Sequence, residues 1–129
     1  MAAAVMAFGI STAIVAMQRG FATLDSARNL TTAAQILACQ IEQLRMHDWA
    51  TVSGYGWGPT TLALDGEFSA SSSVGTRYTV TRTTRLLATD LLEVTYTVAW
   101  RGADGRSHTR AMTTCYARHG IHDYYYNHS

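Results

Sequence analysis

The chain has 129 residues, of which 47% are hydrophobic and 15% are charged, and its formal net charge is +1. This length fits one domain, and the near-neutral charge gives no global electrostatic reason to expect a nucleic acid or an acidic partner. All ten basic residues are arginines, which excludes catalysis through a Schiff-base lysine or a phosphate-loop lysine.

The first segment, residues 1–17, is an almost unbroken apolar run whose only polar residues are Ser11 and Thr12. Both hydroxyls can bond back to helix carbonyls, which lowers the cost of placing them in lipid. As a helix the run would be about 25 Å long, slightly less than the hydrocarbon core of a bilayer. Its alanines and Gly9 let another helix approach closely, as helices packed in lipid do. We therefore expect a marginal membrane span that also packs against other helices. A secretory signal peptide fits less well, because no basic segment precedes the run and the helical pattern continues far beyond it.

The helical pattern continues from residue 18 to about residue 50 and becomes amphipathic. Apolar residues recur at three- and four-residue spacing, which predicts one buried face. They are Leu30, Ala34, Leu37, Ile41 and Leu44. Gly20 lowers helix stability by about 1 kcal/mol relative to alanine, so a bend or a melted turn is expected near residues 18–23. The helix should end near residues 50–53, because a glycine-rich stretch with the only proline follows.

After this loop the apolar residues alternate with period two, which predicts strands. Candidate strands cover residues 68–70, 77–85, 93–101 and 107–118, with turns at residues 71–75 and 102–105. These elements predict an α+β fold, in which a long N-terminal helix packs on an antiparallel β-meander of three or four strands. The expected segments are an apolar helix half (1–22), an amphipathic helix half (23–52), a glycine-rich loop (53–65) and a sheet domain with an aromatic tail (66–129).

The expected core lies between the amphipathic helix face and the clearest strand, residues 93–101. It consists of Leu37, Ile41 and Leu44 from the helix and Val94, Val98 and Trp100 from the strand. A two- or four-residue loop at the Asp104-Gly105 turn would bring the following strand back with its small residues on this same face. Those residues are Ala111, Thr113, Cys115 and Ala117.

The two cysteines, Cys39 and Cys115, are too far apart in sequence to form a Cys-x-x-Cys motif. Cys115 is expected to face the helix, whereas helical geometry places Cys39 about 160° from Leu37, away from the apolar face. This argues against a Cys39–Cys115 disulfide. Such a bond would nevertheless close a large loop and stabilise the fold in an oxidising compartment, so it stays open as the less favoured alternative.

No pattern in the sequence indicates catalysis, and we expect neither an enzyme nor a cofactor, because no Gly-x-Ser-x-Gly nucleophile elbow is present. A polar cluster near the C-terminus lacks the fixed tetrahedral set that zinc requires, so no metal site is expected. It comprises His119, His122, Asp123 and His128. Five strand arginines interleaved with tyrosines could form a nucleic-acid surface, but the near-neutral net charge favours solvated strand faces and subunit contacts. They are Arg77, Arg82, Arg85, Arg110 and Arg118.

The order of these elements resembles the type IV pilin superfamily, which includes the pilins of type IV pili and the pseudopilins of type II secretion. Residues 1–9 (MAAAVMAFG) are similar to the helix just after the pilin processing site. Residues 92–100 (LEVTYTVAW), with their hairpin, are similar to the sheet of minor pilins. The family's leader glycine, phenylalanine and nearby glutamate do not precede the apolar run. The resemblance therefore implies either a start upstream of Met1 or a member without that glutamate.

The resemblance implies a structural filament subunit, held in the inner membrane by its first helix half and then carried in a periplasmic or extracellular filament. Its partners would be copies of itself in a helical homopolymer, or other pilins. Contacts between helices in the filament core would be made by Ala3, Phe8, Ile10, Ile14 and Met17. The alternative is a membrane-anchored extracytoplasmic binding or adhesion module, although a rigid rod of about 50 residues exceeds what an anchor needs.

Overall fold

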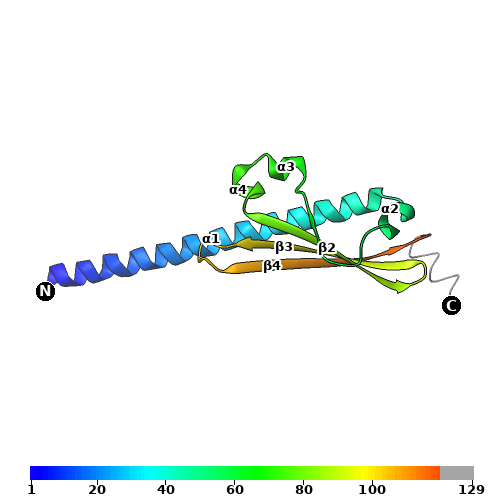
Figure 1. Cartoon of the computed structure of the whole chain (residues 1–129). Coiled ribbons are helices and arrows are strands. Elements are labelled where there is room, and N and C mark those ends of the chain that lie inside the picture. Colours follow the sequence, from blue (N-terminus) through cyan, green and yellow to red (C-terminus); the bar gives the residue numbers. More distant parts are fainter. Residues whose placement is uncertain (120–129) are drawn as a thin grey trace.

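The computed structural model describes residues 1–119, with only the backbone of residues 72–73, so the aromatic tail predicted at residues 120–129 lies outside the described residues. In chain order the elements are α1 (Ala2–Met46), α2 (Trp49–Ser53), β1 (Thr60–Leu62), α3 (Gly66–Ser69), α4 (Ser72–Gly75), β2 (Tyr78–Ala88), β3 (Leu91–Arg101) and β4 (Ser107–Ala117). The strands form one antiparallel sheet in the order β1-β2-β3-β4. The long helix α1 lies along one face of this sheet (Figure 1). The predicted α+β fold is confirmed.

The helix α1 is 45 residues long and is continuous through Gly20, so the melted turn predicted near residues 18–23 is wrong. The single glycine costs too little to interrupt a helix of this length. The helix ends at Met46, earlier than predicted, because His47 is extended and Asp48 begins α2. The Asp48 carboxylate accepts a hydrogen bond of 2.9 Å from the Thr51 N–H, which caps the new helix.

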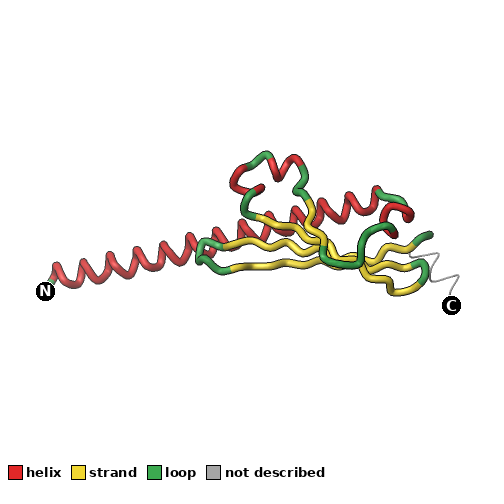
Figure 2. The backbone as a smooth tube through the Cα atoms, viewed as in Figure 1, coloured by secondary structure: helices red, strands yellow, loops and turns green. Residues whose placement is uncertain are grey.

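Only the second half of α1 belongs to the domain, and the first half projects away from the sheet (Figure 2). Every residue up to Arg28 is exposed except Asp25, which is partly buried. The buried stripe of α1 consists of Asn29, Ala33, Ile36, Leu37, Gln40 and Leu44. The predicted stripe is therefore wrong at its start, because Leu30 and Ala34 are exposed. The Tyr78 hydroxyl explains the difference, since it donates a 3.1 Å hydrogen bond to Asn29 Oδ1 and draws this polar residue inward.

The core lies between the buried stripe of α1 and the alternating face of the sheet. Leu37, Leu44, Val94, Val98 and Trp100 are all buried in it, and Ile41 packs against it. The core also contains Ala33 and Ile36 of α1 and Leu92 and Tyr96 of β3, together with Val52 of α2 and Tyr78 and Val80 of β2. Because β3 is paired on both edges and covered on one face, its side chains alternate without exception between buried and partly exposed from Leu91 to Trp100.

The segment between α2 and β2 differs from the prediction in three places. Residues 68–70 are not a strand, because Gly66–Ser69 forms the short helix α3, which Asp65 caps by accepting a 2.6 Å hydrogen bond from the Gly66 N–H. The first strand, β1, lies instead within the stretch predicted to be loop, where Leu62 pairs with Val80. The turn predicted at residues 71–75 is one turn of helix, α4.

The hairpin between β3 and β4 has a different loop length from the one predicted. The Gly102 N–H bonds the Arg106 carbonyl at 2.9 Å, so the loop has three residues and ends in Gly105 at φ 75°, as three-residue hairpins commonly do. The register of β4 against β3 therefore differs by one residue from the predicted register, and Cys115 pairs with Glu93 instead of lying beside Val94. A one-residue shift moves a whole strand face to the other side of the sheet. The placement predicted for Ala111, Thr113, Cys115 and Ala117 is therefore wrong, and these residues lie on the face away from α1.

We predict that the two leucines near the start of the stripe differ strongly in their contribution to stability. Leu37 is 1% exposed and Leu30 is 43% exposed. Leu37→Ala should lower the free energy of unfolding by ~2–5 kcal/mol because it leaves a cavity, whereas Leu30→Ala should change it by less than about 1 kcal/mol. Denaturant titration of the full chain in detergent micelles, followed by near-UV circular dichroism, measures both. Equal losses would contradict the helix phase described here.

Candidate functional site

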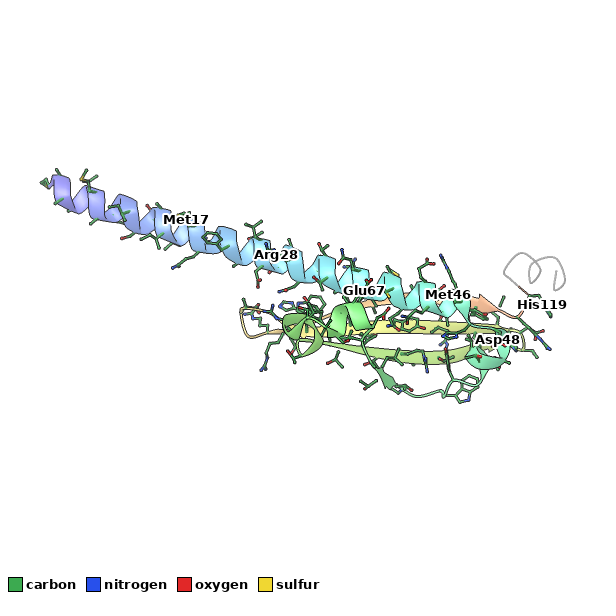
Figure 3. The ribbon with its side chains drawn as sticks, turned by 90° about the horizontal axis from the view of Figure 1, so that it is seen from above. Met17, Arg28, Met46, Asp48, Glu67 and His119 are labelled. Atoms are coloured by element: carbon green, nitrogen blue, oxygen red, sulfur yellow. The ribbon has the colours of Figure 1, made fainter. Side chains whose placement is uncertain are left out.

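The first half of α1 carries a long apolar surface that has no partner within residues 1–119. Its large side chains are exposed, with Phe8 at 74%, Ile10 at 62%, Ile14 at 50% and Met17 at 61% of their full accessible area. Figure 3 shows Met17 on the projecting part of α1, beyond the sheet. By length and composition alone this helix could cross a membrane, and none of its most apolar window is buried. Exposed apolar surface on this scale indicates contact with lipid or with other chains.

The few polar groups on this surface are satisfied within the helix. The Ser11 hydroxyl donates to the Ala7 carbonyl at 2.8 Å. The Thr12 hydroxyl is 2.9 Å from the Gly9 carbonyl and 3.1 Å from the Phe8 carbonyl. Because these hydroxyls need no water, the surface remains compatible with lipid or with a dry helix–helix interface.

The five residues predicted to make filament-core contacts do not all lie on one face. At 3.6 residues per turn, Ala3, Ile10, Ile14 and Met17 fall within about 60° of one another, whereas Phe8 lies about 150° from their centre. The opposite side of the helix, around Phe8, also carries the exposed Val5 and Val15, so the helix is apolar all round, as expected where several neighbours or lipid surround it.

The apolar surface reaches slightly beyond the apolar helix half predicted at residues 1–22. Phe21 and Leu24 are 66% and 65% exposed, and they line an open groove on α1 together with Arg28 and Thr31. Their four- and three-residue spacing after Met17 was the available signal. The change to polar residues at Gln18 and Arg19 obscured this apolar spacing. The surface therefore reaches to where the helix meets the sheet domain.

The two cysteines lie in different environments and are both free. The Cys39 thiol is 3.4 Å from Asp65 Oδ2, which also accepts a 2.9 Å hydrogen bond from Gln43 and so joins α1 to the start of α3. Burial, followed by the neighbouring Asp65 carboxylate, raises the pKa of the Cys39 thiol. Cys115 lies on the far face of β4. The sheet separates the two thiols, so the alternative of a Cys39–Cys115 disulfide does not fit this fold.

The polar residues considered as ligands are also dispersed. Within residues 1–119, no group of three or more His, Cys, Asp or Glu side chains is placed to hold a metal ion. His122, Asp123 and His128 lie outside the described residues. The strand arginines considered for nucleic acid do not form one surface. Arg82 lies 3.4 Å over the Tyr55 ring on the helix side, while Arg85 lies on the far face, 3.6 Å from Glu93.

We predict that a maleimide reagent modifies Cys115 much faster than Cys39. The thiolate is the reactive form, and the raised pKa of Cys39 leaves less thiolate at about pH 8, whereas Cys115 is exposed on the sheet. The single-cysteine variants Cys39→Ser and Cys115→Ser separate the two rates by mass spectrometry. Asp65→Asn should accelerate modification of Cys39 and leave Cys115 unchanged. Formation of an intramolecular disulfide in the oxidised, folded protein would contradict this placement.

Comparisons with protein-family models, with curated protein sequences and with solved structures find no match to this chain.

Proposed function

We propose that the protein is a structural subunit of a bacterial type IV pilus or of a filament like the type II secretion pseudopilus, and that it polymerises through the first half of α1. One observation carries the proposal: a single unbroken helix contributes its second half to a protein core and exposes an apolar first half. The sheet domain, with its small core, then forms the outer layer of the filament. The order of the elements supports the same proposal through its resemblance to pilins.

In the proposed mechanism the subunit waits in the inner membrane, where the first half of α1 is surrounded by lipid. Lipid tails are as apolar as leucine, so burial alone does not drive these helices together. Close packing does, and the small side chains of the alanines and Gly9 permit it. The space beside Gly9 is open to a neighbouring helix, since a Cβ added there would meet nothing within 4 Å. Extraction into a periplasmic or extracellular filament replaces lipid contacts with contacts between helices.

The second candidate is a membrane-anchored extracytoplasmic binding or adhesion module. The length and composition of α1, which are sufficient for a membrane span, favour it as much as they favour a filament subunit. The continuation of the same helix to Met46 favours the filament, because an anchor can be joined to its domain by a flexible linker, whereas a packed polymer needs a fixed geometry between the helix and the domain.

We predict that Ile14→Asp abolishes filaments while leaving the sheet domain folded. A carboxylate in the middle of an apolar helix costs at least ~2.5 kcal/mol in lipid, enough to reduce incorporation about a hundredfold. Ala34→Asp is the matched control, because Ala34 is exposed on the half of α1 that belongs to the domain. Electron microscopy of material from the native source, with circular dichroism of each variant, measures assembly and folding.

Normal filaments from Ile14→Asp would refute the proposed assembly surface. If the unmodified protein is found only as a dispersed membrane protein, the binding-module alternative is favoured instead.

A further inference from the structure

The arginines of the domain separate into two groups according to whether they have a partner. Toward the C-terminal end of α1, Arg45 pairs with Glu42 at 2.6 Å, Arg85 with Glu93 at 3.6 Å and Arg118 with Asp90 at 3.6 Å. Arg82, near the middle of β2, stacks on Tyr55. The other six arginines form no ion pair with a carboxylate anywhere in residues 1–119. They are Arg19, Arg28, Arg77, Arg101, Arg106 and Arg110, and we call them the basic collar.

Most of the basic collar lies toward the end of the sheet domain from which α1 projects. The tip of the β3–β4 hairpin lies against the helix there, since Ala103 and Asp104 line a common hollow with Ala22 and Ser26. The start of β2 and the end of β3 are at the same level, because Tyr78 pairs with Trp100. Figure 3 shows Arg28 on α1 between the projecting segment and the rest of the domain. Arg77, Arg101 and Arg106 thus lie at this end of the sheet, whereas Arg110, which pairs with Val98, lies farther along β4.

Few negative charges offset the collar. Within residues 1–119, Asp25 on α1 and Asp104 in the hairpin are carboxylates of this region. The Asp104 carboxylate accepts a 3.0 Å hydrogen bond from the Arg106 backbone N–H and lies 3.4 Å from the His108 ring, and these contacts lower the pKa of Asp104. The Asp25 carboxylate accepts a 3.4 Å hydrogen bond from the Asn29 amide. Both acids are thus engaged locally, and the arginine side chains remain available to an external anion.

The position of the collar matches the level of lipid headgroups. The exposed apolar surface of α1 reaches Phe21 and Leu24, so the polar boundary of a span formed by this helix lies near these residues, and the long side chain of Arg19 can reach it. Ala103 and Asp104 of the hairpin line a hollow together with Ala22, Thr23 and Ser26 of α1, at the same level. Guanidinium groups bind phosphate oxygens through paired hydrogen bonds, and phosphate is the anion present at this depth.

We propose that the basic collar binds the headgroups of anionic phospholipids while α1 spans the membrane. This inference rests on the membrane-inserted state in the proposed function. Basic residues at an anionic membrane surface each strengthen binding by about fivefold, equivalent to ~1 kcal/mol. The collar would therefore hold the hairpin against the membrane surface and fix the orientation of the subunit before assembly. A nucleic acid fits the arrangement less well, because it would meet exposed apolar side chains such as Phe21 and Leu24 at the base of the helix.

The test uses the full chain in lipid nanodiscs of phosphatidylcholine, with or without phosphatidylglycerol. Hydrogen exchange at residues 101–110 should slow about fivefold or more when phosphatidylglycerol is present, and the effect should be lost in about 0.5 M NaCl, where charge interactions are screened. Neutralising the hairpin arginines with Arg101→Gln, Arg106→Gln and Arg110→Gln should also abolish the slowing of exchange by phosphatidylglycerol. The control carries Arg45→Gln, Arg85→Gln and Arg118→Gln, which lie at the other end, and should keep it.

The outcomes separate this inference from the proposed function. Equal exchange in both lipids, or protection that survives neutralisation of the hairpin, overturns the collar but leaves the filament proposal intact. Failure of the chain to enter nanodiscs overturns both. A DNA oligonucleotide that protects the hairpin in phosphatidylcholine discs as strongly as phosphatidylglycerol does would overturn the assignment to lipid and indicate nucleic acid instead.

Discussion

The continuity of α1 is the constraint on which the rest of the structure depends. The helix runs without interruption from Ala2 to Met46, so its phase at Leu37 also determines where every side chain of the exposed half points. The sheet fixes that phase, because Leu37 packs against it and Tyr78 donates a hydrogen bond to Asn29. One rigid element therefore joins a protein core to an apolar surface that has no partner among the described residues.

Much of the fold could be predicted because the two main periodicities are uninterrupted. Strand β3 alternates strictly, and burial in the middle of the sheet gives each alternate side chain the environment that its type favours. The apolar run at residues 1–17 gave an equally clear prediction. The helix prediction failed at Leu30 and Ala34, which are exposed. The polar Asn29 is buried instead, because the Tyr78 hydroxyl donates a hydrogen bond to its side chain.

The remaining differences come from contacts that a single segment does not contain. An Asp-Gly pair fits loops of two, three or four residues, and only the pairing of Gly102 with Arg106 selects three. That one-residue difference moved Cys115 to the far face of the sheet. Likewise, a short apolar segment around Phe68 suits a strand or a helix, and the cap supplied by Asp65 decided for helix. The basic collar could not be predicted either, because it is defined by which arginines lie beside a carboxylate in the folded domain and which do not.

The two ends of the sheet domain have different surroundings, and this difference explains why paired and unpaired arginines lie at different ends. At the end near Met46, the chain supplies its own contacts. The Tyr116 hydroxyl donates a hydrogen bond to the His47 carbonyl, Tyr116 stacks on Trp49, and Arg118 forms an ion pair with Asp90. At the other end, α1 continues outward and its surroundings come from outside the chain. An apolar helix that leaves a domain can have lipid or neighbouring helices around it, and unpaired arginines at its base suit the first, because headgroup phosphates lie at that depth. Packing between helices in a filament offers no such layer of phosphate. The same end of the domain would therefore gain its counter-charges in the membrane and exchange them for subunit contacts when the helix is extracted.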